Sequence, residues 1–122
     1  MPSLLFSFPK QSRLRKPAEY KKVFANPVKS TDTYFTLLAI GNCYGYPRLG
    51  LAIAKKNIRK AVDRNSIKRT VRESFRSRQH KLISIDVVVL ARKDAANASS
   101  EILRKSLDRH WLRLVNRCES CS

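Results

Sequence analysis

The chain has 122 residues, the length of one domain with a single modest core, and its hydrophobic fraction of 43% excludes a disordered polycation. Its 26 Lys and Arg residues against 9 Asp and Glu residues give a formal net charge of +17, which attracts either nucleic acid or an anionic membrane surface. A membrane-surface binder has a basic helix and little independent core, whereas here apolar strands and turns separate the helices, so the composition favours nucleic acid.

The first half of the chain predicts an arm, a short helix and two strands. We expect a flexible arm over residues 1–12 and a helix over residues 17–24, because Pro17 suits the first helical position. Residues 33–40 are β-branched, aromatic and aliphatic and predict a strand. Residues 48–54 predict a second strand with apolar side chains on one face and small ones on the other, where another backbone can pass close by. We expect these two strands to pair as an antiparallel hairpin.

The second half predicts two long helices and one strand. Residues 58–79 contain no Pro or Gly and predict the longest helix, and residues 85–91 form a nearly continuous apolar run, typical of a strand covered on both faces. Residues 99–115 predict a helix with one apolar face, followed by a polar tail over residues 116–122. The order α-β-β-α-β-α predicts one α+β domain over residues 13–115, a small α/β sandwich with helices packed on a central, mainly antiparallel sheet.

The longest predicted helix and the residues just before it carry most of the charge. Ile67, Val71 and Phe75 form an apolar stripe at about 100° per residue, and bases crowd beside the stripe with only two acids among them. Arg64 shares the azimuth of the stripe, so it should reach sideways over the edge of the core. Phosphates that bind such a face release condensed counterions, which drives association with RNA. The expected RNA-binding residues have basic or amide side chains: Lys55, Lys56, Arg59, Lys60, Arg64, Asn65, Lys68, Arg69, Arg72 and Arg76.

This helix carries a family signature. Residues 61–75, AVDRNSIKRTVRESF, resemble the pattern A-x-x-R-N-R-x-K-R-x-x-R-E-x-F of the bacterial ribonuclease P protein. Three further segments resemble that family in the same order: residues 13–24, 49–56 and 86–92. The resemblance covers roughly residues 12–115, and four matched segments are far more specific than one motif. Ser66 departs from the pattern, so one RNA contact is either missing or supplied by Arg69 or Arg59.

The resemblance implies a division of labour with RNA. In this family a catalytic RNA holds the Mg²⁺ ions and performs the hydrolysis, and the protein binds that RNA and the 5′ leader of precursor tRNA, whose removal gives the mature 5′ end. The family fold also implies a left-handed βαβ crossover. A cleft between the first helix and the sheet takes the leader, and the family's aromatic residues there match Tyr20 and Phe24 and, less closely, Phe35. Aromatic rings beside a basic groove stack single-stranded bases, but core packing explains Tyr20 and Phe24 equally well.

The residues give no independent sign of a catalytic or metal site. The aspartates are scattered, and surface or packing roles explain His80 and His110, so we expect no catalytic and no metal-binding residue in this chain and no cleavage by the protein alone. Cys118 and Cys121 have the C-x-x-C spacing of zinc ligands, but no second pair accompanies them, which favours incidental tail cysteines.

The expected partners are the catalytic RNA and precursor tRNA, with no membrane and no obligatory protein partner. An odd number of cysteines argues against a disulfide framework, and the first residues lack the features of a signal peptide, so we expect a cytoplasmic protein. The alternative function is that of a ribosomal protein or a general RNA-binding chaperone, which composition alone does not separate from the subunit hypothesis.

Overall fold

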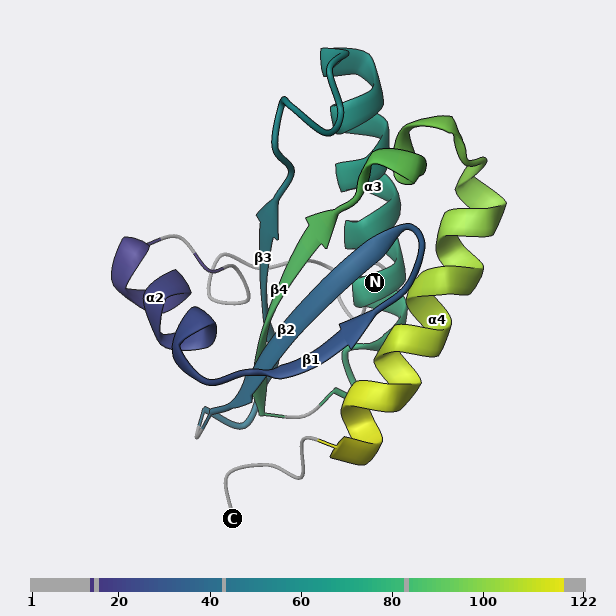
Figure 1. The fold of residues 1–122 in the computed structure, drawn as a ribbon. Coiled ribbons are helices and arrows are strands. Elements are labelled where there is room, and N and C mark those ends of the chain that lie inside the picture. Colours follow the sequence, from purple (N-terminus) through teal and green to yellow (C-terminus); the bar gives the residue numbers. More distant parts are fainter. Residues whose placement is uncertain (1–13, 15, 43, 83, 118–122) are drawn as a thin grey trace, which may run out of the picture.

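The computed structural model describes Leu14 and residues 16–42, 44–82 and 84–117 (Figure 1). The predicted arm over residues 1–12 and the three cysteines lie outside the described residues. The elements in chain order are α2 (Pro17–Ala25), β1 (Val28–Thr31), β2 (Phe35–Gly41), β3 (Arg48–Ala52), α3 (Ala61–Arg78), β4 (Ile85–Ala91), the 3-10 helix η2 (Lys93–Asn97) and α4 (Ser100–Arg117).

The four strands form one sheet in the order β1-β2-β4-β3. The pairs β1/β2 and β2/β4 are antiparallel, and the pair β3/β4 is parallel and joined by α3. The predicted α+β class with a mainly antiparallel sheet is therefore confirmed. The predicted hairpin between residues 33–40 and 48–54 is wrong, because β4 lies between β2 and β3. As the most continuously apolar strand, β4 takes an inner position where both its edges are paired and both its faces are covered.

The strand β1 was not predicted. Its sequence VKST has little apolar pattern, and it is held by pairing with β2, from Val28 opposite Ala39 to Thr31 opposite Thr36. The Asp32 carboxylate then accepts hydrogen bonds from the backbone N–H groups of the second and third residues after it, at 2.8 and 2.9 Å. This turn explains why β2 begins two residues later than the predicted start at residue 33.

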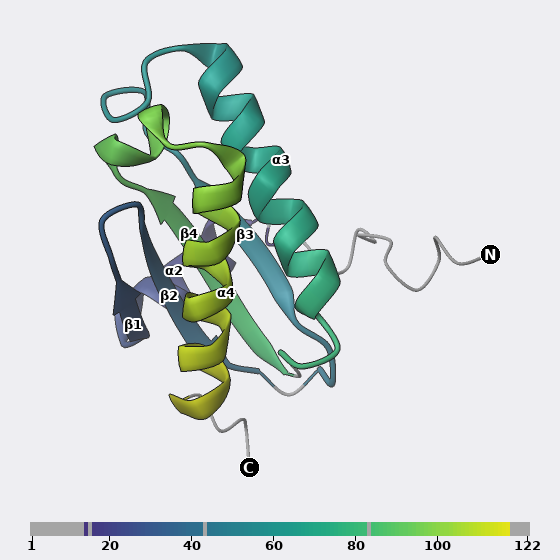
Figure 2. The ribbon, with the colours of Figure 1, turned by 90° about the vertical axis from the view of Figure 1, so that its right-hand side faces the viewer.

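Helices cover both faces of the sheet (Figures 1 and 2). α2 packs on one face, and α3 and α4 lie side by side on the other. The side chains of β4 divide between the two layers: Val87 and Val89 belong to the core under α3 and α4, whereas Val88 belongs to a smaller core under α2. The prediction that this strand is covered on both faces is confirmed.

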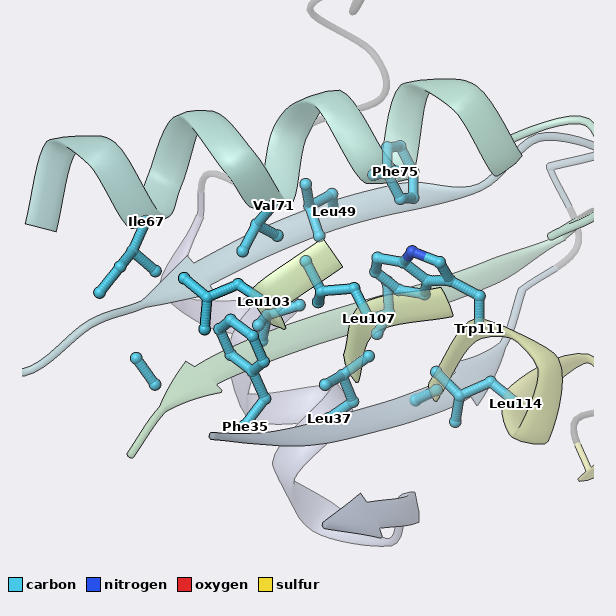
Figure 3. Packing of buried hydrophobic residues seen from close by; sticks show 14 of the residues in the cluster. Phe35, Leu37, Leu49, Ile67, Val71, Phe75, Leu103, Leu107, Trp111 and Leu114 are labelled. Atoms are coloured by element: carbon cyan, nitrogen blue, oxygen red, sulfur yellow. The ribbon is translucent and has the colours of Figure 1, made fainter. Parts of the chain in front are cut away.

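The larger core joins α3, α4 and the sheet (Figure 3). Ile67, Val71 and Phe75 of α3 are buried, as the predicted stripe requires, and they face Leu107 and Trp111 of α4 across the core. The Phe75 and Trp111 rings meet edge to face, with centroids 6.0 Å apart. The apolar faces predicted for the two long helices therefore form one layer boundary, which holds α3 in a fixed orientation on the sheet.

The boundaries of the long helices differ slightly from prediction. α3 begins at Ala61 and not at Ile58, because the backbone N–H of Ile58 donates to the Ala54 carbonyl at 3.0 Å and the chain makes a turn there. Ile58 itself is fully buried and closes one end of the larger core. α4 extends to Arg117, two residues beyond the predicted end at residue 115. Among the described residues, no helix has the length and apolar character that crossing a membrane requires.

Candidate nucleic-acid interface

Apart from Arg78, which pairs with Asp108 of α4, the basic side chains of α3 lie on the flank of the helix that turns away from α4. Starting from the buried stripe, Lys68, Arg72 and Arg69 follow one another around this flank at about 100° per residue. The opposite flank has Glu73 and Ser77, which border a groove shared with α4. The burial of one stripe therefore directs the bases to one side of the molecule and leaves the mixed flank to α4.

Every predicted RNA-binding side chain is at least partly open to solvent. Seven are exposed: Lys55, Lys56, Arg59, Lys60, Asn65, Arg69 and Arg72. Three are half-buried: Arg64, Lys68 and Arg76. None of them takes part in the ion pairs formed among the described residues. We call these residues the basic face; their charges are not neutralised by the protein itself.

The loop before α3 is anchored at two points. The side-chain amide of Asn57 donates to the Ala91 carbonyl at 3.3 Å, and one guanidinium nitrogen of Arg64 donates to the carbonyls of Ile58 and Arg59 at 2.9 and 2.8 Å. Arg64 thus reaches back to the loop, whereas the sequence predicted that it would reach sideways over the edge of the core. It positions the lysines of the loop beside the helix and also contributes its own charge to the basic face.

The other face of the sheet carries the predicted aromatic residues. A Cβ atom at Gly50 would lie 2.8 Å from the Tyr20 ring, and the Tyr20 hydroxyl donates to the Leu14 carbonyl at 3.2 Å. The close approach predicted at the small face of β3 is therefore made by a tyrosine ring and not by a backbone. Phe24, one turn further along α2, is 46% exposed. Tyr20 therefore packs on the sheet with its ring only partly exposed, whereas the ring of Phe24 is accessible to a ligand.

The assignment of Phe35 to the leader cleft is wrong. Its side chain is fully buried in the larger core, on the α3 and α4 side of the sheet, whereas Tyr20 packs in the smaller core under α2. Alternation along β2 separates Phe35 and Leu37 from Leu38, which faces α2. A base could reach Phe35 only if the larger core opened.

A buried ion network ties α2 to the sheet and was not predicted. Arg48 donates to both oxygens of Asp86, at 2.8 and 2.6 Å, and to Glu19 of α2 at 2.6 Å. Asn42 donates to Asp86 at 2.7 Å. The hydrogen bonds to Asp86 raise the pKa of Arg48 against the opposing effect of burial. An aspartate inside an otherwise apolar strand was the signal in the sequence, because a buried carboxylate needs a cationic partner.

A second buried polar cluster joins β1 to α4. His110 is fully buried, with Nδ1 2.6 Å from the Ser30 hydroxyl and Nε2 3.2 Å from the Asp32 carboxylate, which also accepts from Ser106. Burial would raise the pKa of Asp32, but the hydrogen bond from Ser106, those from two backbone N–H groups and the electrostatic effect of nearby His110 together lower it to about 2. The arrangement has the residue types of a hydrolytic triad, but Ser106 and His110 are fully buried, so its role is structural.

The described residues contain no group of three or more His, Cys, Asp and Glu side chains placed to hold a metal ion. The acids of the structure serve the two buried networks or lie singly at the surface. What the geometry offers is a binding surface: a basic helix flank on one side and an aromatic face under α2 on the other.

A small α+β fold with a basic helix flank, uncompensated by acids, defines a nucleic-acid-binding protein. The family model described as Ribonuclease P matches residues 8–115. The chain belongs to the ribonuclease P protein family, the protein component of a tRNA-processing ribonuclease.

Known relatives agree along almost the whole chain. The ribonuclease P protein component of Methylococcus capsulatus is 48% identical over 122 residues, covering 100% of this chain and 95% of the relative. That of Escherichia coli O157:H7 is 44% identical over 107 residues, covering 88% of this chain and 90% of the relative. The solved RNase P protein of Thermotoga maritima superposes with a TM-score of 0.74 at 31% identity, covering 88% of this chain and 100% of that one. The resemblance and the predicted subunit role are confirmed, and nothing in these comparisons favours a ribosomal protein or a chaperone.

Proposed function

We propose that the basic face binds the catalytic RNA of ribonuclease P, while the face under α2 binds the single-stranded 5′ leader of precursor tRNA. The binding of the catalytic RNA is supported by the solvent-accessible Lys and Arg side chains on one flank of α3, which form no ion pairs within the described protein. Each RNA phosphate that they neutralise releases counterions and so strengthens binding. The exposed ring of Phe24 supports the second half, since bases stack on aromatic rings without a sequence requirement.

The hydrolysis itself is assigned to the RNA in this proposal. The Mg²⁺ ions are expected in the RNA subunit, and the protein's contribution is to hold RNA and substrate together through positive charge and stacking. We expect the protein in the cytoplasm, together with its RNA partner. Reconstitution of the protein with the catalytic RNA should lower the Mg²⁺ concentration needed for cleavage, whereas the protein alone should cleave nothing.

The basic face is tested by the salt dependence of binding to the catalytic RNA. Lys68→Ala and Arg72→Ala should each weaken binding and reduce the slope of log K against log salt by about one phosphate's worth. Lys105→Ala is the matched control, because it removes the same charge from an exposed position on α4. An equal reduction by the control would show that total charge matters and that the basic face does not.

The leader face is tested by comparing precursor tRNA with leaderless tRNA in the reconstituted holoenzyme. Phe24→Ala should lose about 1–3 kcal/mol of affinity for the substrate with the leader and nothing for the leaderless one. Leu112→Ala is the matched control, since it removes an exposed apolar side chain, 65% exposed, from α4. If Phe24→Ala affects both substrates equally, the leader does not bind at this face.

A further inference from the structure

The link between β2 and β3 presents an aromatic ring that the proposed function does not use. Tyr44 is 56% exposed, although it is one of the larger apolar side chains of the protein. The Arg48 guanidinium carbon lies 4.4 Å from the centre of its ring, within the range of a cation–π contact. The Tyr44 backbone N–H donates to the Asn42 side chain at 3.0 Å, and Gly45 follows in the left-handed region at φ +84°. Backbone and ring are both held in place.

Arg48 makes a rigid support for this ring. All three of its guanidinium nitrogens donate to carboxylates, Nε and Nη2 to Asp86 and Nη1 to Glu19. Two carboxylates around one guanidinium leave a formal local charge of −1, which does not attract a phosphate. What this site can accept is a flat, uncharged aromatic group against the exposed part of the Tyr44 ring, beside the Tyr46 ring, whose centre lies 5.8 Å away. A ring that is already fixed loses little side-chain entropy when a ligand stacks on it.

The site is continuous with the face under α2. Arg48 and Gly50 alternate onto the same face of β3, and Gly50 carries the Tyr20 ring. Glu19, the neighbour of Tyr20 in α2, forms the ion pair with Arg48. A single strand lying against Tyr20 and Phe24 therefore has Tyr44 next along the same side of the sheet, beyond the first turn of α2.

We propose that Tyr44, held by Arg48, is a further base-stacking residue for the single-stranded leader and takes one nucleobase on the exposed part of its ring. This inference rests on the proposed binding of the leader at the α2 face. The contact is a stack, so it accepts any base and adds affinity without sequence preference.

The test uses the reconstituted holoenzyme with precursor tRNA and with leaderless tRNA. Tyr44→Ala should weaken binding of the substrate with the leader by roughly 5- to 150-fold, the range that one lost stack gives, and leave the leaderless substrate unchanged. Tyr44→Phe keeps the ring and should restore the affinity. A 2-aminopurine base moved stepwise along the leader should show one position whose fluorescence is quenched by the wild type and by Tyr44→Phe but not by Tyr44→Ala.

The remaining outcomes separate this inference from the proposed function. If Phe24→Ala loses leader-dependent affinity and Tyr44→Ala does not, the leader binds under α2 but does not reach Tyr44, and the inference fails alone. If neither variant distinguishes the two substrates, the leader face itself fails. An equal loss for both substrates in Tyr44→Ala would assign the ring to the catalytic RNA and overturn the inference. Thermal unfolding of each variant checks that the fold is intact. Because Tyr44 is exposed, we expect its replacement to leave the fold unchanged.

Discussion

Replacing Asp86 by Asn should reveal how strongly the buried ion network stabilises the fold. Asp86 is 2% exposed and accepts three hydrogen bonds, two from Arg48 and one from Asn42. An asparagine keeps the volume but offers one acceptor oxygen, and its amide group then faces other donors. Removing one partner of a buried ion pair costs about 3–5 kcal/mol. Since Arg48 keeps its pair with Glu19, we expect a loss at or below the lower end, about 2–3 kcal/mol.

The loss is measured as the change in the free energy of unfolding in urea, followed by circular dichroism. Asp108→Asn is the matched control, because Asp108 pairs with Arg78 at 3.5 Å at the surface, where the two side chains are 46% and 41% exposed. Such a pair is worth about 0.5 kcal/mol or less. A loss below about 1 kcal/mol in Asp86→Asn, or the same loss in both variants, would refute the idea that this buried network stabilises the fold.

Three more predictions follow from close contacts. Gly50→Ala should displace the Tyr20 ring, since the new Cβ would lie 2.8 Å from it, and should lower the affinity for leader-bearing substrate without changing the salt slope for the catalytic RNA. Burial lowers the pKa of His110, so protonation of this side chain favours the unfolded chain. Its contribution to the free energy of unfolding is therefore complete above the unfolded pKa of about 6.5 and is lost as the pH falls below that value. Urea unfolding at pH 5–8 should show a smaller loss of stability at low pH in His110→Gln than in the wild type. Trp111→Phe removes the 2.7 Å hydrogen bond to Ser74 inside the core and should lower the free energy of unfolding by about 1–3 kcal/mol in the same urea assay.

Features set by local periodicity could be predicted from the sequence. The apolar run of β4 and the stripe Ile67, Val71 and Phe75 of α3 each record which side chains meet the core, so they give both the element and its buried face. The basic flank of α3 could be predicted from the same stripe, because the charged residues lie at the helix positions that do not face the core. The family signature added the function, which no single pattern defines.

Features set by contacts distant in sequence could not be predicted. Nothing in residues 33–54 shows that β4 will insert between the two strands, and β1 is held by pairing and by the contact of Ser30 with His110, 80 residues away. Phe35 was assigned to the leader cleft from the family resemblance alone, and alternation along β2 does not tell which of its faces meets α2. Tyr44 carried no signal, because its exposure and its contact with Arg48 depend on the fold of the link.

The inner position of β4 also determines when the sheet can be completed during synthesis of the chain. β3 pairs with β4 and with no other strand of the described sheet, and β4 is the last strand to leave the ribosome. A nascent chain that ends after α3 can form the β1/β2 hairpin, but β3 still lacks its neighbour and the stripe of α3 lacks the strand that covers it. The parallel pair closes late and across a long stretch of chain, which slows folding. Throughout this interval the basic segment of α3 is present without the sheet that orients it. RNA that contacts the unfinished chain is therefore attracted by its positive charge before the folded binding surface exists.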